Sequence, residues 1–262
     1  YTEHAVDFIQ RNKENPFLLY VPHSMPHVPL FASEDFRGKS GLGLYGDVML
    51  EIDWSVQQIN QTLKDNGLED NTVIILTSDN GPWISYGNHA GETPFREAKG
   101  TSFDGGIRSA CIIKYPPNIK AGSTSERAFF TIDLLPSLAH LAGVKLPEQE
   151  IDGHNLWRYI WGHPKEKNTH DYYAFSNGSQ FQGVMSGSGH WKLHLPHNYR
   201  TLDTDGGDGM PGKYRQEKID TALYHLHVDP MESENLWERV PTMGKQLLDY
   251  AIEHKELFYS EN

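Results

Sequence analysis

The feature that most constrains this chain is a run of apolar, mostly β-branched residues at positions 72–77, which polar residues follow at once. A short run without a polar face predicts a strand buried on both sides. Residues 16–21 and 110–115 have the same character, and each run ends at a proline. Apolar residues at helical spacing predict helices over residues 47–64 and 131–142. Strands that alternate with helices indicate an α/β sheet covered by helices on both faces.

The pattern of the chain changes between residues 162 and 170. Before this point the predicted elements belong to the α/β sheet, and after it they are short and predict an α+β subdomain with a small antiparallel sheet. We therefore expect two domains, residues 1–165 and residues 166–262. The elements expected in the second are strands at 172–176, 182–186, 191–195 and 223–227, a loop at 203–212 rich in Gly and Asp, and a helix at 242–257.

Composition excludes several classes of protein. The 35 acidic and 23 basic side chains give a net charge of −12, which argues against nucleic acid as the main partner. No apolar run approaches the roughly 18 residues of a membrane span. Cys111 is the sole cysteine, so intrachain disulfides and cysteine-based zinc sites are excluded. Its apolar neighbours predict a buried, inert thiol. The residues define no oligomeric state.

Asp79 and Asn80 directly follow the predicted strand at 72–77. Ligands of open α/β sheets bind at the carboxyl ends of strands, so these side chains occupy the expected active edge. Carboxylate and amide oxygens suit Ca²⁺ or Mg²⁺ better than zinc. The dipeptide alone fits equally well with a turn that closes the strand.

Two further groups of polar residues can bind an anion. His23 and His27 lie in a proline-rich stretch, which presents them on stiff, extended backbone. Histidine there can bind an anion or transfer a proton. Arg96 and Lys99 precede a glycine-rich stretch and can form a local anion site in an otherwise acidic chain. Ordinary loop side chains are the alternative for both groups.

Together these stretches resemble the formylglycine-dependent sulfatases, or arylsulfatases, a branch of the alkaline-phosphatase superfamily. Residues 68–81 are similar to the family's metal-binding strand end, and residues 99–108 to its second signature, which begins with the active-site lysine. His27 stands in the place of the family's active-site histidine. Residues 223–236 are similar to the closing strand and turn of its C-terminal subdomain. The resemblance covers nearly the whole chain, and it implies an alkaline-phosphatase-like sheet.

The resemblance also implies roles for four residues. Asp79 and Asn80 would be two ligands of a divalent cation, usually Ca²⁺, with Mg²⁺ as a substitute. Lys99 and His27 would be catalytic and contact the sulfate ester and its bridging oxygen. The family's nucleophile is a formylglycine made within a Cys/Ser-x-Pro-x-Arg motif, and residues 1–262 lack that motif. We expect this chain to be the C-terminal part of such an enzyme, with the formylglycine upstream, and to be inactive alone.

A sulfated carbohydrate is the preferred substrate class, and an aryl sulfate is the alternative. Imidazole and guanidinium groups can hold sulfate and hydroxyl groups, and Trp83 and Tyr86 can stack on a sugar. The expected substrate-binding residues are His23, His89, Arg96, His197 and Arg200. For His197 and Arg200 an ordinary surface role is an equal alternative.

Two other functions remain open. A phosphatase, phosphodiesterase or phosphonate hydrolase of the same superfamily would share the fold, but its two-zinc members typically carry Asp-His where this chain has Asp79-Asn80. A noncatalytic module that binds sulfated glycans would explain the missing nucleophile motif. The family resemblance implies a periplasmic, secreted or lysosomal location.

Overall fold

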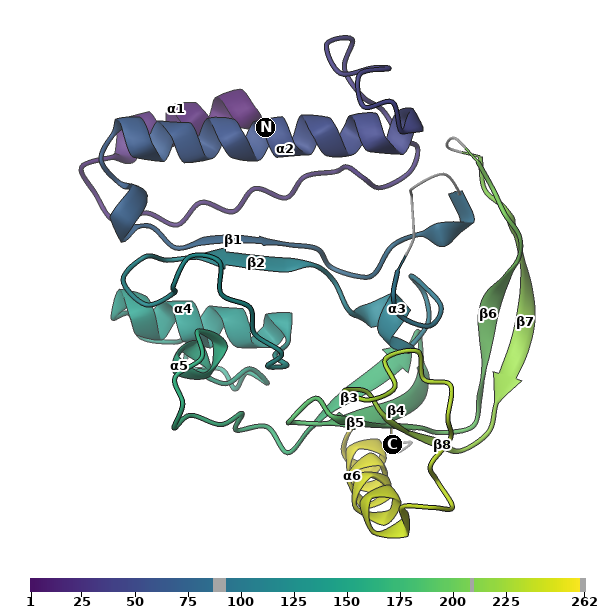
Figure 1. The fold of residues 1–262 in the computed structure, drawn as a ribbon. Coiled ribbons are helices and arrows are strands. Elements are labelled where there is room, and N and C mark those ends of the chain that lie inside the picture. Colours follow the sequence, from purple (N-terminus) through teal and green to yellow (C-terminus); the bar gives the residue numbers. More distant parts are fainter. Residues whose placement is uncertain (87–92, 208–209, 260–262) are drawn as a thin grey trace.

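The computed structural model describes residues 1–86, 93–207 and 210–259. A pair of antiparallel strands lies between two layers of helices (Figure 1). The strands are β1 (Ile74–Thr77) and β2 (Cys111–Lys114). Helices α1 (Thr2–Asn12) and α2 (Gly43–Asp65) cover one side, and α4 (Leu134–Ala142) and α5 (Trp157–Ile160) cover the other. The expected sheet with helices on both faces is therefore confirmed. The remaining short helices are η1 (Glu69–Asn71), η2 (Ile84–Tyr86), α3 (Asp104–Ile107) and η3 (Thr131–Asp133).

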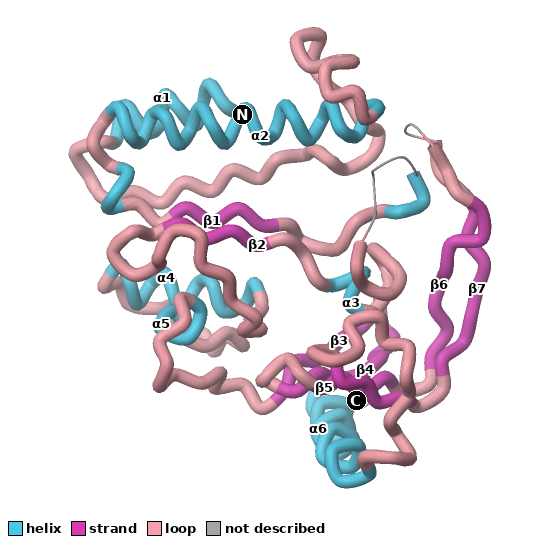
Figure 2. Tube along the Cα trace, in the orientation of Figure 1, coloured by secondary structure: helices cyan, strands magenta, loops and turns pink. Residues whose placement is uncertain are grey.

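The predicted strand at residues 16–21 is wrong. This segment is extended but forms no ladder, and Figure 2 draws it as a loop. Leu18 and Tyr20 are 80% and 82% exposed. The physical reason is the missing partner, because extended backbone becomes a strand only when a neighbour accepts its hydrogen bonds, and no described strand pairs with it.

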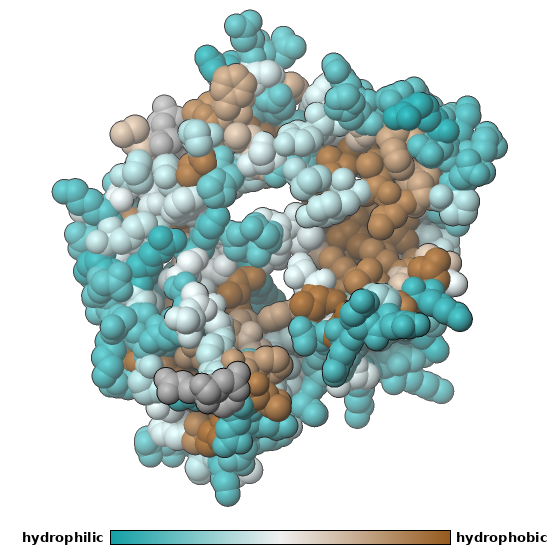
Figure 3. Space-filling view, turned by 180° about the vertical axis from the view of Figure 1, so that it is seen from behind, coloured by the Kyte–Doolittle hydropathy of each residue, from teal (hydrophilic) through white to brown (hydrophobic). Residues whose placement is uncertain are grey.

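The prediction that Cys111 is buried is also wrong, because this residue is exposed. It pairs with Thr77 in a sheet that has only two strands among the described residues, so both strands are edges. The prediction that the strands at 72–77 and 110–115 are buried on both sides is wrong for the same reason, because apolar side chains such as Leu76 and Ile112 are exposed. Figure 3 shows broad apolar surface on the side of the molecule that faces away in Figure 1. Among the described residues, no helix combines the length and apolar character of a membrane span.

Helix α2 begins at Gly43, before the predicted residue 47. Asp47 lies within its first turns, and its side chain anchors the preceding loop. Its carboxylate accepts hydrogen bonds from the backbone N–H of Gly38 at 2.7 Å and from that of Ser40 at 2.9 Å. The preceding loop is thereby held against the helix. Gly67 follows the helix with a φ of 68°, a left-handed conformation that costs glycine little.

The predicted small antiparallel sheet is confirmed. It has the order β3-β4-β5-β8, and helix α6 (Pro241–Tyr259) packs on one face through Leu247 and Ala251. Its strands are β3 (Tyr172–Asn177), β4 (Gln180–Ser186), β5 (Trp191–His194) and β8 (Ala222–His225). Strands β6 (His197–Thr204) and β7 (Lys213–Ile219) form a hairpin that the sequence analysis did not predict. The expected loop at 203–212 contains the turn of this hairpin.

A buried polar cluster lies on the sheet side that faces α3. Lys192 and Glu232 are fully buried, and His194 is 1% exposed. The Lys192 Nζ lies 2.5 Å from Asp104 Oδ1 and 3.1 Å from Glu232 Oε1. The His194 Nε2 lies 2.9 Å from the same Glu232 oxygen. The ring of His194 stacks on Phe103. This cluster joins the C-terminal sheet to residues 102–104.

Stability should depend on pH through His194. Burial lowers its pKa to about 4, although the hydrogen bond to Glu232 acts in the opposite direction. In the unfolded chain His194 therefore takes up a proton near its ordinary pKa of 6.5, whereas in the folded chain its imidazole stays neutral until about pH 4. We expect His194 to contribute a loss of about 3 kcal/mol in the free energy of unfolding as the pH falls through this range.

Urea denaturation at several pH values measures this loss. In the His194→Gln variant, which keeps a donor toward Glu232 but cannot titrate, the decline should be shallower by that amount. Equal pH dependence in both proteins would contradict the assignment.

Candidate active site

Two sequence-distant segments meet at the end of β1. The backbone N–H of Gly81 donates to the Gly106 carbonyl at 2.9 Å, and the N–H of Lys99 donates to the Pro82 carbonyl at 3.0 Å. A Cβ on Gly81 would lie 1.9 Å from the Gly105 oxygen, and one on Gly105 would lie 2.1 Å from the Glu97 oxygen. The glycines of both motifs are therefore needed for close backbone packing.

This packing brings Lys99 and His27 to the same aromatic ring. The Lys99 Nζ lies 4.8 Å from the centre of the Trp83 ring, and the His27 ring lies 5.3 Å from it at 67°. The His27 Nδ1 is 2.7 Å from the Val28 carbonyl, which can only accept, so Nδ1 carries hydrogen and Nε2 is the atom left for substrate. Among the described residues, no carboxylate pairs with the Lys99 ammonium, which leaves it available to an anion.

Asp79 and Asn80 follow β1 directly and lead into the same contact. Asp79 is exposed, and the nearest side-chain partner of its carboxylate is the Ser78 hydroxyl at 3.4 Å. Asn80 is half-buried. In the described part of the chain, no three His, Cys, Asp or Glu side chains are grouped to hold a metal ion. The two oxygen donors fit a hard cation, and they supply only part of the six to eight ligands that Ca²⁺ takes.

Arg96 and Arg200 bind backbone within the protein. Arg96 Nη1 donates to the Glu232 carbonyl at 2.8 Å, and its guanidinium lies 4.2 Å from the Phe103 ring centre. Arg200 Nη2 donates to the Lys99 carbonyl at 2.6 Å. Both side chains therefore hold the polypeptide around Lys99, and their expected contact with substrate stays a prediction.

Two of the other expected substrate-binding residues, His23 and His197, make their contacts away from Trp83. His197 is buried in β6, where its Nδ1 lies 2.7 Å from the Leu195 carbonyl. His23 lies against Tyr1, with 5.7 Å between the ring centres. Burial lowers the pKa of both imidazoles. His89 lies outside the described residues. Their roles toward substrate remain predictions.

The sequence analysis missed Lys192 and Glu232, and it gave Trp83 only a role in stacking sugars. A signal for Lys192 exists, because a lysine within the apolar stretch 191–195 needs a buried carboxylate partner. The partner Glu232 is forty positions further along the chain, and no local pattern marks it.

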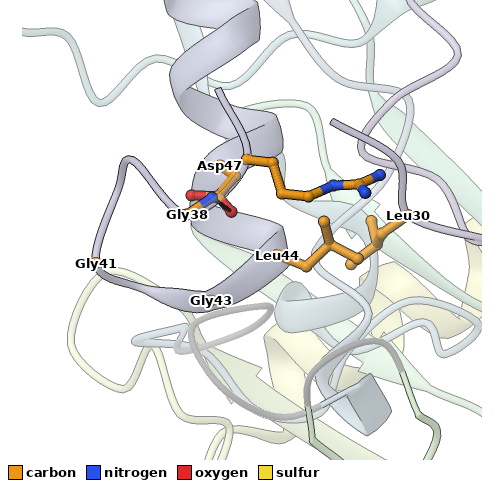
Figure 4. A pocket seen from close by; sticks show the side chains of 7 residues that line it. Leu30, Gly38, Gly41, Gly43, Leu44 and Asp47 are labelled. Atoms are coloured by element: carbon orange, nitrogen blue, oxygen red, sulfur yellow. Dashed lines mark hydrogen bonds between the residues drawn. The ribbon is translucent and has the colours of Figure 1, made fainter. Parts of the chain in front are cut away.

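A pocket of about 400 Å³ lies elsewhere, at the start of α2 (Figure 4). Its lining includes Leu30, Leu44 and Asp47, and none of the candidate catalytic or metal-binding residues. The Asp47 carboxylate is already occupied by the loop at residues 38–40. We therefore place the candidate active site at Trp83, where the Lys99 ammonium and the His27 ring converge.

Comparisons with known proteins identify the family of this chain. The profile of the family described as Sulfatase matches residues 1–144. Human steryl-sulfatase is 38% identical over an alignment of 253 positions, which covers 90% of this chain and 43% of the relative. Mouse N-acetylgalactosamine-6-sulfatase is 41% identical over an alignment of 249 positions, which covers 88% of this chain and 47% of the relative. The chain therefore belongs to the sulfatase family, and it spans about half the length of these relatives.

A solved structure shows the same fold. It comes from Bacteroides thetaiotaomicron and is described in connection with the metabolism of multiple glycosaminoglycans. The TM-score is 0.79 at 31% identity, and the match covers 97% of this chain and 53% of the other. The match supports the expected alkaline-phosphatase-like fold, and the division into residues 1–165 and 166–262 stays a prediction.

Arg96 and Lys99 should differ in their effect on stability. Arg96→Lys removes the paired contacts with the Glu232 carbonyl and the Tyr199 hydroxyl, which a single ammonium cannot reproduce. We expect it to lower the free energy of unfolding by about 1–3 kcal/mol. Lys99→Met removes a cation that has no carboxylate partner among the described residues. It should change the free energy of unfolding by less than about 0.5 kcal/mol. Urea denaturation of both variants tests the distinction, and effects of equal size would refute it.

Proposed function

We propose that the protein carrying this chain hydrolyses sulfate esters. The observation that carries the proposal is the Lys99 ammonium, which has no carboxylate partner among the described residues and shares the Trp83 ring with His27, close in sequence to Asp79 and Asn80. An anion entering this site meets a fixed cation and an imidazole at once. The names of the relatives support sulfate as that anion, since they are sulfatases of steroid and sugar esters.

Each residue has a distinct task in this reaction. Cleavage of the ester leaves negative charge on the bridging oxygen, and Lys99 stabilises that charge as it develops. In its doubly protonated form, His27 can hand a proton from Nε2 to the same oxygen and keep the Nδ1 hydrogen that it donates to the Val28 carbonyl. The ring of Trp83 contacts both groups and so brings them to one aromatic side chain.

We further propose that Asp79 and Asn80 hold one Ca²⁺, with Mg²⁺ as a substitute. A divalent cation supplies Lewis-acid polarisation of the nonbridging sulfate oxygens when it is bound. The exposed Asp79 carboxylate has no cationic partner among the described residues and is therefore free to bind it. The nucleophile in this proposal is a formylglycine outside residues 1–262, since none of these residues lies in the required motif.

The proposed substrate class is a sulfated carbohydrate, with aryl and steryl sulfates as alternatives. Two relatives are named for sugar substrates, the N-acetylgalactosamine-6-sulfatase of mouse and the N-acetylgalactosamine-6-O-sulfatase of Bacteroides thetaiotaomicron. Aromatic rings of Trp83 and Tyr86, whose centres lie 5.1 Å apart, offer faces on which a sugar can stack. A periplasmic, secreted or lysosomal location accompanies this proposal.

Lys99→Ala should lower turnover by about 10²-fold or more in the full-length protein, because one electrostatic donor to the reacting oxygen is lost. The measurement is the hydrolysis of 4-nitrocatechol sulfate and of a sulfated galactosaminide. The matched control is Lys145→Ala, which removes an exposed lysine on a segment remote from Trp83 and should leave turnover unchanged. Full activity of Lys99→Ala would return Lys99 to an ordinary loop residue, and faster cleavage of phosphate than of sulfate esters would favour the phosphatase alternative.

Metal analysis of the full-length protein should find one Ca²⁺ or Mg²⁺ per chain. Asp79→Ala should weaken Ca²⁺ binding by about tenfold or more in calorimetric titration, because a charged ligand is lost. Asp203→Ala, at the exposed end of β6, is a control that should bind Ca²⁺ like the wild type. Two zinc ions at the site would contradict the sulfatase assignment.

A further inference from the structure

The backbone around Lys99 is held by side chains from three strands of the C-terminal region. Asn177 Nδ2 donates to the Gly100 carbonyl at 3.1 Å, and Arg200 Nη2 donates to the Lys99 carbonyl at 2.6 Å. Lys192 Nζ donates to the Ser102 carbonyl at 3.1 Å. These carbonyls belong to one short stretch, so side chains of the C-terminal region fix the backbone that carries Lys99.

Lys192 is the central contact of the three. Its ammonium is fully buried and also bonds to the carboxylates of Asp104 and Glu232. The other Glu232 oxygen accepts the backbone N–H of Asp104 at 2.7 Å. The cluster thus binds residues 102–104 through a carbonyl, an N–H and a side chain. A buried charge cannot leave its partner without a large penalty, so this attachment is rigid.

We propose that Lys192 and Glu232 are positioning residues for Lys99. The inference rests on the proposed function in one respect only, namely that Lys99 acts on the substrate. In the part of the chain that the structure describes, the Lys99 ammonium forms no ion pair, so its location depends on the Trp83 ring and on its own backbone. Lys99 lies three residues before Ser102, whose carbonyl Lys192 holds, and small displacements of a catalytic group are costly.

The alternative is that the cluster merely joins two parts of the fold. Asp133 provides a matched control, because its carboxylate is equally buried and also joins the two parts. It lies 2.6 Å from His170 Nε2 and 3.0 Å from the Tyr173 hydroxyl, and among the described residues it forms no hydrogen bond or ion pair with residues 96–106. Glu232→Gln and Asp133→Asn are the same chemical change at two buried sites.

Hydrogen–deuterium exchange of the full-length protein tests positioning without reference to activity. In Glu232→Gln, peptides that cover residues 99–106 should exchange about tenfold faster or more, with the rest of the chain little changed. Lys192→Met should have the larger effect of the same kind. Asp133→Asn should leave these peptides at the wild-type rate. Unchanged exchange at 99–106 in Glu232→Gln, or the same increase in Asp133→Asn, would overturn the proposal.

Kinetics then test the link to Lys99 in a double-mutant cycle. Glu232→Gln should reduce kcat by about tenfold or more with little change in KM, since the catalytic group and not substrate binding is disturbed. Placed on the Lys99→Ala background, the same change should cost less than about twofold, because nothing remains to be positioned. Equal losses on both backgrounds would mean a purely structural role.

These readouts separate the two proposals. If the wild-type protein hydrolyses no sulfate ester, the proposed function fails, and exchange at residues 99–106 still decides whether Lys192 and Glu232 hold that stretch. Should Lys192→Met not fold, Glu232→Gln carries the test, because Lys192 keeps Asp104 as its buried partner.

Discussion

The arrangement of the site depends on the buried ammonium of Lys192. This group is saturated by two carboxylates and a carbonyl, and it has no route to water. Residues 102–104 are therefore attached to the C-terminal sheet by charge, where apolar packing alone would allow sliding. Three residues before Ser102, the backbone N–H of Lys99 donates to the Pro82 carbonyl. This hydrogen bond attaches the loop after β1 to the same framework. A position set in the C-terminal sheet is transmitted in this way to the end of β1.

The distribution of cations explains how an acidic chain can receive an anion. Arg96 and Arg200 are close in space to Lys99, but carbonyl groups of the protein occupy their guanidinium groups. Lys99 differs because its ammonium lies over the aromatic face of Trp83. An aromatic face attracts the ammonium without neutralising it. The site therefore keeps one cation for the ligand and uses the other two to build the surrounding backbone.

Several elements of the fold could be predicted because their signals are local. These signals involve only residues a few positions apart in sequence. They are the helical spacing of residues 47–64 and 131–142, the short strands after residue 172, and the polar residues after β1. The strand at residues 16–21 was wrong for the converse reason, because a strand needs a partner that local pattern cannot supply. The β6–β7 hairpin was missed since its residues, such as Asn198 and Lys218, are largely polar.

The sequence by itself determined the family, the residue types of the site and their order along the chain. Asp79, Asn80, Lys99 and His27 could be named because each lies in a motif that resembles the sulfatases. Only the tertiary structure decided that His27 and Lys99 share the Trp83 ring and that Arg96 and Arg200 bind backbone. The reason is physical. The partner of a buried charge or of an aromatic face is fixed by packing between segments that lie far apart in sequence, and no local pattern records that distance.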